Sequence, residues 1–419
     1  MVGTMMRGWY TLAAIICACS STAATGMGEE SALALSEHGA LHINSSAPAT
    51  QPVLLNGLDV VRTIQEQKAA IQAQRELIAH QGRTISALRR RMCSLRPPHL
   101  GHITGIGEED DASGWLGGVP AANGLIYGVP LHASAVLIIN PTTNTLDTTS
   151  IAGLPAGMFK WGEGVLAPNN NNIYCFPSNH DSVLKIDPAA GTADWTTITG
   201  VGALQHKFRT GSLGLNGLIY APPAHATFVL IIDPTTDTVD TTTLDGLAET
   251  GWKWTGSVLA PDGRIFGIPT NADSVLIVDP ATNTLDTTSL AGLGAGDKWG
   301  HGVLARNGLI YGIPFSKDSV LIVDPVSMTV DTTTIAGIEG DGKWVAGALA
   351  PDGRVVGIPY FSDAVLLVNP DDNSTDTTTF PQVGASSESK YFGAATAANG
   401  RVYTIPLNAD SVLTIDVGC

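Results

Sequence analysis

The hydrophobic and polar positions of this chain repeat along most of its length. From Trp115 onward an aromatic residue, called here the marker, recurs at intervals of 45 to 47 residues. The markers are Trp115, Trp161, Phe208, Trp254, Trp299, Trp344 and Tyr391. Each marker opens a unit of short apolar runs separated by polar turn residues. A period of this length is typical of solenoids and propellers, so the repeat is the strongest signal in the sequence.

One unit is enough to show which elements the pattern predicts. Its runs cover residues 298–305, 308–314, 318–325 and 329–335. Their β-branched content favours strands, and the Asn-Gly, Pro and Asp-Pro separators are turn formers that end each strand. Four antiparallel strands in a unit of this length describe one propeller blade. We therefore predict an all-β, seven-bladed β-propeller over residues 97–419.

The seventh unit has only three of its four strands, because the chain ends soon after Ser411–Asp416. Residues 102–107 precede the first marker and resemble the fourth-strand ending at residues 333–338. Pairing that N-terminal segment with the last unit closes the ring and leaves no open sheet edge. The closure would also bring Cys93 near Cys419, so we expect a disulfide between them in an oxidising compartment.

The repeat resembles a known family. Residues 271–285 read Asn-Ala-Asp-Ser-Val-Leu-Ile-Val-Asp-Pro-Ala-Thr-Asn-Thr-Leu and are similar to the YVTN family of propeller repeats. The resemblance covers every blade. It implies a propeller fold and leaves function open, because that family and its relatives include surface-layer and binding propellers as well as a few lyases.

The segment before the propeller divides into three parts. Residues 1–24 carry Arg7, an apolar run and a small-residue stretch, which is the layout of a cleaved secretory signal rather than a transmembrane anchor. Residues 25–57 are small, polar and unpatterned, so we expect a flexible spacer. Residues 58–96 carry an apolar heptad. Its seam residues are Ile64, Ile71, Ile78, Ile85 and Met92.

The heptad predicts a coiled-coil stalk that joins several copies of the chain. A trimer is preferred over a dimer, and a single amphipathic helix packed on the propeller is the alternative. Charge separates the stalk from the propeller: residues 58–96 hold eight Lys or Arg against three Asp or Glu, whereas residues 97–419 hold thirteen against thirty-two. Such an acidic propeller should repel nucleic acid.

Charged residues recur at one face of the expected propeller. A lysine stands directly before most markers, and an aspartate recurs in the turn between the second and third strands. The binding candidates in this set are Lys160, Trp161, Lys253, Trp254, Lys298, Trp299, Lys343, Trp344, Asp273 and Asp318. Together they could hold a polar or anionic ligand. The competing interpretation is structural, because a feature present in almost every blade usually maintains the blade.

Residues that depart from the repeat are the better candidates for chemistry. Two positions after the marker, Glu163 and His301 replace small residues, and Arg209 is the one charged residue a step earlier. If these side chains face the channel, they could transfer a proton or bind an oxyanion, although drift at a solvent-filled channel would give the same pattern. The set has too few ligands for a catalytic metal; calcium at the turn 369–373 is conceivable, and no other cofactor is indicated.

These observations lead to one preferred function and two alternatives. We expect a secreted or cell-surface recognition or structural propeller that binds an extracellular protein or glycan and gains avidity from display on the stalk. The first alternative is an enzyme, a lyase or hydrolase, that uses Glu163, Arg209 and His301 at the channel mouth. The second is a surface or matrix protein that assembles with itself.

Overall fold

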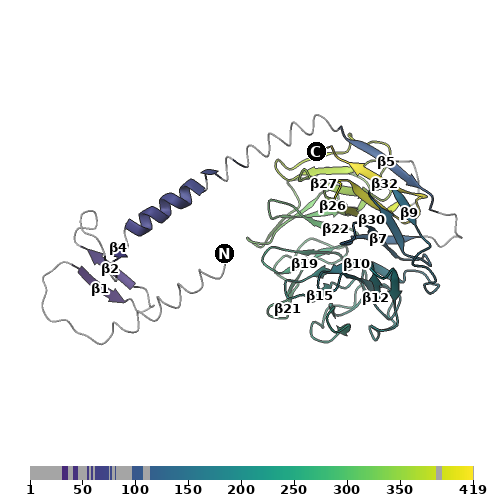
Figure 1. Ribbon diagram of the computed structural model, residues 1–419, viewed down its shortest axis with the longest axis horizontal. Coiled ribbons are helices and arrows are strands. Elements are labelled where there is room, and N and C mark those ends of the chain that lie inside the picture. The colour runs from purple at the N-terminus through teal and green to yellow at the C-terminus, as the bar shows by residue number, and fades with distance from the viewer. Residues whose placement is uncertain are drawn as a thin grey trace. The chain divides into compact units, whose positions relative to one another are not determined.

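The computed structural model describes residues 31–35, 41–45, 54–55, 58–59, 62–74, 76–77, 81, 97–106, 114–383 and 389–418. The chain divides into two compact units, Met1–Ala87 and Leu88–Cys419 (Figure 1). The predicted signal sequence and the predicted Cys93–Cys419 disulfide lie outside the described residues. No helix in the described part of the chain is long and apolar enough to cross a membrane.

The first unit contains short strands and one helix. Strand β1 (Ser31–Leu35) pairs antiparallel with β2 (Leu41–Ser45), and β3 (Leu54–Leu55) pairs with β4 (Leu58–Asp59). Strands β1 to β3 fall in the segment expected to be a flexible spacer. In β1 and β2, Ser-Ala-Leu-Ala-Leu and Leu-His-Ile-Asn-Ser, a large apolar residue recurs at every second position, and sequence reasoning missed this short pattern.

The helix covers residues 62–74, and residues 76–77 and 81 are also helical. It lies inside the range predicted for the stalk. Ile64 and Ile71, two residues of the predicted seam, are 46% and 51% exposed. The later seam residues, Ile78, Ile85 and Met92, lie outside the described residues, and self-association of this helix stays a prediction.

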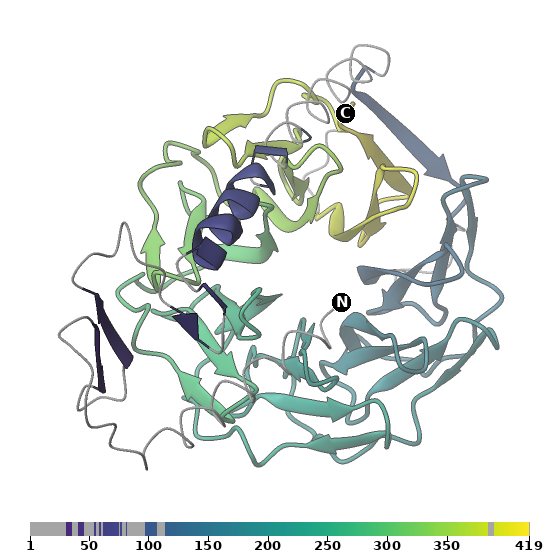
Figure 2. The same ribbon diagram turned by 60° about the vertical axis from the view of Figure 1, so that its left-hand side comes forward.

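The second unit is built from seven four-stranded antiparallel sheets, so the predicted seven-bladed β-propeller is confirmed (Figure 2). Blade 1 contains β6 (Trp115–Pro120), β7 (Ile126–Pro130), β8 (Leu137–Asn140) and β9 (Thr145–Asp147). Blade 2 contains β10 (Trp161–Ala167), β11 (Asn172–Pro177), β12 (Leu184–Asp187) and β13 (Thr192–Asp194). Blade 3 contains β14 (Ser212–Leu213), β15 (Ile219–Ala221), β16 (Leu230–Asp233) and β17 (Thr238–Asp240).

The remaining blades follow the same order. Blade 4 contains β18 (Trp254–Leu259), β19 (Ile265–Pro269), β20 (Leu276–Asp279) and β21 (Thr284–Asp286). Blade 5 contains β22 (Trp299–Leu304), β23 (Ile310–Pro314), β24 (Leu321–Asp324) and β25 (Thr329–Asp331). Blade 6 contains β26 (Trp344–Leu349), β27 (Val355–Pro359), β28 (Leu366–Asn369) and β29 (Ser374–Asp376). Blade 7 contains β30 (Tyr391–Thr396), β31 (Val402–Pro406), β32 (Ser411–Asp416) and β5 (His99–Thr104).

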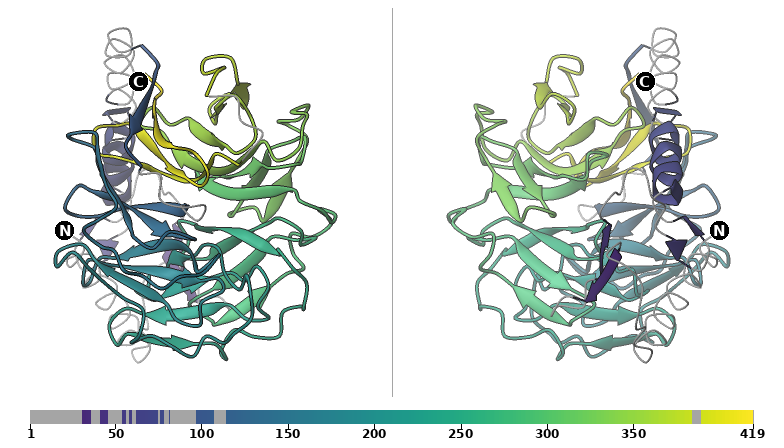
Figure 3. Two further views of the ribbon diagram at one scale, coloured as in Figure 1. Left: turned by 90° about the vertical axis from the view of Figure 1, so that its right-hand side faces the viewer. Right: turned by 90° about the vertical axis from the view of Figure 1, so that its left-hand side faces the viewer.

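Blade 7 combines strands from both ends of the propeller sequence. Strand β5 pairs antiparallel with β32, with Ser411 opposite Thr104 and Asp416 opposite His99 (Figures 1 and 3). The pairing strand begins three residues earlier than the segment that the sequence indicated. Inner strand β30 also packs against β6 of blade 1.

The inner strands crowd closely around the propeller axis. In most blades the pairing with the second strand shifts register just after the marker, as between Trp254 and Gly256. Small residues are needed there: a Cβ added at Gly300 would overlap the carbonyl oxygen of Val345 in the next blade. A larger residue at such a position must find its space in the channel itself.

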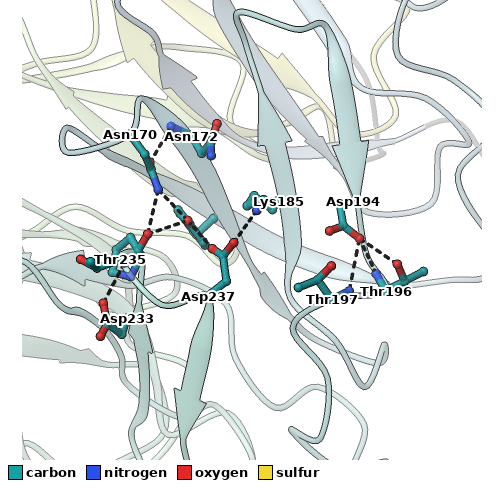
Figure 4. Close-up of polar contacts among 11 residues, drawn as sticks. Asn170, Asn172, Lys185, Asp194, Thr196, Thr197, Asp233, Thr235 and Asp237 are labelled. Carbon is teal, nitrogen blue, oxygen red and sulfur yellow. Dashed lines mark hydrogen bonds and ion pairs between the residues drawn. The ribbon is translucent and has the colours of Figure 1, made fainter.

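Neighbouring blades are also joined at their outer turns, as Figure 4 shows for blades 2 and 3. The side-chain amide of Asn170 donates to the Tyr174 hydroxyl (2.9 Å) and to the carbonyl oxygen of Pro234 (2.8 Å). Tyr174 donates to Asp237 at 2.7 Å, and Lys185 pairs with the same carboxylate at 2.5 Å. Turn residues of the repeat therefore have a structural role in holding one blade to the next.

Candidate functional site at the channel mouth

The lysines that precede the markers are buried, not displayed to solvent. Lys160, Lys253, Lys298 and Lys343 are each 5% exposed or less. The Lys160 ammonium donates to the carbonyl oxygens of His132 (2.7 Å) and Ala133 (2.9 Å), which belong to the preceding blade. Burial lowers the pKa of Lys160 to about 8, so the side chain still carries its charge at neutral pH. The ammonium groups of Lys160, Lys298 and Lys343 thus join loops of adjacent blades, whereas that of Lys253 donates to Thr250 in its own loop.

The other members of the predicted binding set make similar internal contacts. The indole nitrogens of Trp161, Trp254, Trp299 and Trp344 each donate to a backbone carbonyl in their own blade. The Asp273 carboxylate accepts from the amides of Gly292 and Gly294, and the Asp318 carbonyl accepts from Ile338. These contacts fit the structural interpretation of the repeated residues, while their use in binding stays a prediction.

Two of the three residues that depart from the repeat are in direct contact. Glu163 belongs to β10 of blade 2 and His301 belongs to β22 of blade 5. The Oε2 atom of Glu163 lies 2.9 Å from Nε2 of His301, and both side chains are largely buried. The two atoms are close enough for an ion pair when His301 is protonated, and Nε2 makes no hydrogen bond of good geometry. The second carboxylate oxygen, Oε1, is buried without a partner among the described residues.

The Glu163 carboxylate favours the charged form of the imidazole. Burial by itself disfavours a charged ring, but the charge and contact of the Glu163 carboxylate outweigh it and raise the pKa of His301. When His301 is protonated, its charge balances that of Glu163.

The third departing residue, Arg209, lies among aromatic rings. Its guanidinium carbon is 4.8 Å from the ring centroid of Trp252, 5.0 Å from that of Phe392 and 6.0 Å from that of Phe159. The residue is 8% exposed. Its backbone carbonyl accepts from the Glu163 amide at 2.7 Å, which joins the segment before β14 of blade 3 to β10 of blade 2.

Arg209 lines a cavity of about 190 Å³ at the mouth of the channel. The other lining residues come from loops and strands of blades 4 to 7, with Trp252 and Asp297 from the loops that enter the inner strands. They are Trp252, Thr255, Thr270, Asp297, Gly300, Phe315, Val345, Tyr360 and Phe392. The cavity thus combines one buried cation with four aromatic walls. We call it the Arg209 pocket.

A second group of rings adjoins Arg209 on the side of blades 1 to 4. The ring of Phe159 contacts those of His132 (4.7 Å) and His206 (5.0 Å), and His206 lies 5.0 Å from Trp252. Phe159, His206 and Trp252 occupy the same place in consecutive blades, directly before the lysine. All three have left-handed backbone, with φ of 54°, 53° and 52°. Bulky residues rarely adopt this conformation, so these rings are held in place at some energetic expense.

Sequence reasoning found Arg209 but missed the aromatic walls of its pocket. Phe315 and Tyr360 follow the proline that ends the second strand, where other blades carry Ser178, Ala224 or Thr270. Comparing each position across the blades, rather than only the positions after the marker, would have found them. The described residues contain no group of three or more His, Cys, Asp or Glu that could hold a metal ion, and calcium stays a prediction.

The fold and this site define a seven-bladed β-propeller with a small cavity at the mouth of its channel. No protein-family profile matches the sequence, and no curated protein matches it. Membership of the YVTN family accordingly stays a prediction.

Solved structures share the fold. A catalytically inactive His-to-Ala variant of virginiamycin B lyase from Staphylococcus aureus, solved with quinupristin, is 9% identical and aligns with a TM-score of 0.62. The alignment covers 76% of this chain and 99% of the lyase. The extracellular domain of a protein assigned as a hybrid two-component system of B. thetaiotaomicron is also 9% identical, with a TM-score of 0.55 over 77% of this chain and 43% of that one. At these identities the likeness shows the fold alone.

Proposed function

We propose that this protein is a recognition propeller that binds a small molecule, or the end group of a glycan or peptide, in the Arg209 pocket. The observation that carries this proposal is the break in the repeat. Most inner positions hold residues that maintain the blades, whereas Arg209, Phe315, Tyr360 and Phe392 replace smaller or apolar residues and converge on one cavity. Apolar walls with a few fixed polar groups are the usual composition of a ligand site.

The proposed setting is the cell surface or the extracellular space. The neighbours in fold include an extracellular domain, and the N-terminal residues have the layout of a secretory signal. A disulfide between Cys93 and Cys419 would fit the same compartment. Exposed Ile64 and Ile71 support display of several propellers on one stalk, which would increase the avidity of a weak site.

A ligand screen with two matched variants tests the pocket. The chain without its predicted signal sequence, from about residue 25 onward, is screened by thermal shift against small organic molecules, simple sugars and short peptides. Ligands found in this way are then titrated into Phe315→Ala, which removes a wall of the pocket, and Val326→Ala, which changes a side chain that is 89% exposed on a distant turn.

We expect Phe315→Ala to weaken binding at least tenfold and Val326→Ala to leave it unchanged. Equal affinity of both variants for every ligand found would show that recognition takes place elsewhere. Melting temperatures of the unliganded variants separate loss of binding from loss of fold.

A second candidate function is catalysis by Glu163 and His301. It is favoured by the Oε1 atom of Glu163, which has no hydrogen-bond partner among the described residues and lies beside an imidazole, an arrangement that can move a proton. Quinupristin, the compound bound in the lyase structure, and a panel of esters are suitable substrates to test. A turnover that disappears in His301→Ala but persists in Thr210→Ala, which changes the equivalent position of blade 3, would establish this function.

A further inference from the structure

Arg209 has no partner of opposite charge among the described residues. Among the described residues no carboxylate oxygen lies within 4 Å of its guanidinium, and its Nε atom is buried without a hydrogen-bond partner. A buried cation is costly unless its charge is balanced and its N–H groups are bonded. The three ring faces around it compensate only in part, because a cation–π contact bonds no N–H group.

Within the part of the chain that the structure describes, no carboxylate forms an ion pair with Arg209. The Glu163 amide donates to the Arg209 carbonyl oxygen, but the Glu163 carboxylate lies 2.9 Å from His301 instead. Desolvation lowers the pKa of Arg209 to about 10, while the nearby Tyr360 and Glu163 act in the opposite direction. The guanidinium therefore stays charged at neutral pH and attracts a negative group.

The shape of the pocket limits what that negative group can be attached to. A volume of about 190 Å³ is smaller than the roughly 300–1,000 Å³ of sites for drug-sized ligands, so a single ring or a short chain fits. The walls made by Trp252, Phe315 and Phe392 favour a flat or apolar body. Asp297 also lines the pocket, and its exposed carboxylate repels negative charge, so a ligand would have to carry a single negative group and place it at Arg209.

Resting on the proposed function, we infer that the Arg209 pocket takes a monoanionic organic acid whose carboxylate pairs with Arg209 and whose flat or apolar body packs between the aromatic walls. A planar guanidinium presents N–H groups that match the two oxygens of a carboxylate. The ligand would supply the partner that the described residues do not provide.

Three simple probes separate the contribution of the negative charge from that of the ring. Benzoate carries both, benzamide has nearly the same shape without the charge, and acetate has the charge without the ring. Each is titrated into the full chain by calorimetry in low salt. We expect benzoate to bind at least tenfold more tightly than either other probe, because only benzoate offers both a charged partner for Arg209 and a ring for the aromatic walls. Benzamide binding as tightly as benzoate, or no saturable binding of benzoate, overturns the inference.

Two variants test whether Arg209 causes the preference for benzoate over benzamide. Arg209→Met keeps a side chain of similar length among the rings, and Arg306→Met is the matched control, since Arg306 is exposed on the turn between β22 and β23. Arg209→Met should lose the preference for benzoate over benzamide, and Arg306→Met should keep it. Retention of the preference in Arg209→Met also overturns the inference. The benzoate and benzamide comparison in the unaltered chain stands even if Arg209→Met does not fold.

The failure of this inference can be told from failure of the proposed function. If neutral molecules lose affinity for Phe315→Ala but bind Arg209→Met as tightly as the unaltered chain, the pocket binds ligands other than organic acids. If no ligand responds to Phe315→Ala, the pocket itself is not the site of recognition.

Discussion

Glu163 and His301 form an ion pair at 2.9 Å although they belong to blades 2 and 5, which are separated by two blades on one side of the ring and three on the other. The pair therefore spans the channel. It joins strands that share no backbone hydrogen bonds, in a place where most other blades carry glycine or alanine. Its contribution to stability can be measured separately from that of the blades.

Glu163→Gln should destabilise the propeller by about 1–3 kcal/mol, because it leaves buried polar atoms without a charged partner. The effect should depend on pH. The folded state raises the pKa of His301, so the stabilisation is complete below the unfolded pKa of about 6.5 and is lost as pH rises through the folded pKa. Denaturant unfolding at pH 5.5 and pH 9 measures this. An equal loss at both values would contradict a charged pair.

Lys207→Met should destabilise the chain more than Lys390→Met. The Lys207 ammonium donates to the carbonyl oxygens of Ser178, His180 and Leu204 at 2.8 to 3.0 Å, and its loss would leave them unbonded at a cost of about 1–3 kcal/mol. The Lys390 ammonium has no hydrogen-bond partner among the described residues and lies 4.0 Å from Asp363. Unfolding of the two variants in parallel tests whether these lysines brace the blades, and equal losses would argue against it.

The histidines beside Arg209 should make the propeller sensitive to mild acid. Burial, together with the charge of Arg209, lowers the pKa of His206 and His225. A lowered histidine pKa means that the unfolded chain binds protons first, so stability is full above about pH 6.5 and falls as pH decreases below it.

The double variant His206→Phe with His225→Phe should therefore reduce the fall in melting temperature between pH 7 and pH 5. Phe159 already occupies the equivalent position of blade 2 with the same left-handed backbone, so a phenylalanine at 206 is compatible with the loop. A fall of the same size as in the unaltered chain would assign the acid sensitivity to other groups.

The exposed seam of the first unit makes a prediction about assembly. Replacing Ile64 and Ile71 by aspartate should convert the oligomer that we expect into a monomer, because charges at seam positions cannot be buried between helices. Light scattering after size-exclusion chromatography gives the mass directly. A monomeric unaltered chain would refute the proposed stalk, and a dimer would correct the preferred trimer.

The class of fold and the number of blades could both be inferred from the repeat in the sequence. Each blade is held by neighbours within one unit, for example the Trp299 indole donating to Ser319. Such local requirements repeat with the unit and are visible as a period. Because every blade has an aromatic residue at this position, Trp115 and Tyr391 identify the first and the last blade.

The residues that occupy the channel come from distant parts of the chain, so their contacts are visible only in three dimensions. Glu163 and His301, or Arg209 and Phe392, are far apart in the chain and meet because the ring closes. The lysines looked like surface charges in the sequence, and only their position between blades shows that backbone carbonyls surround them. A repeat records the contacts that every blade must make, whereas contacts across the axis occur once and leave no period in the sequence.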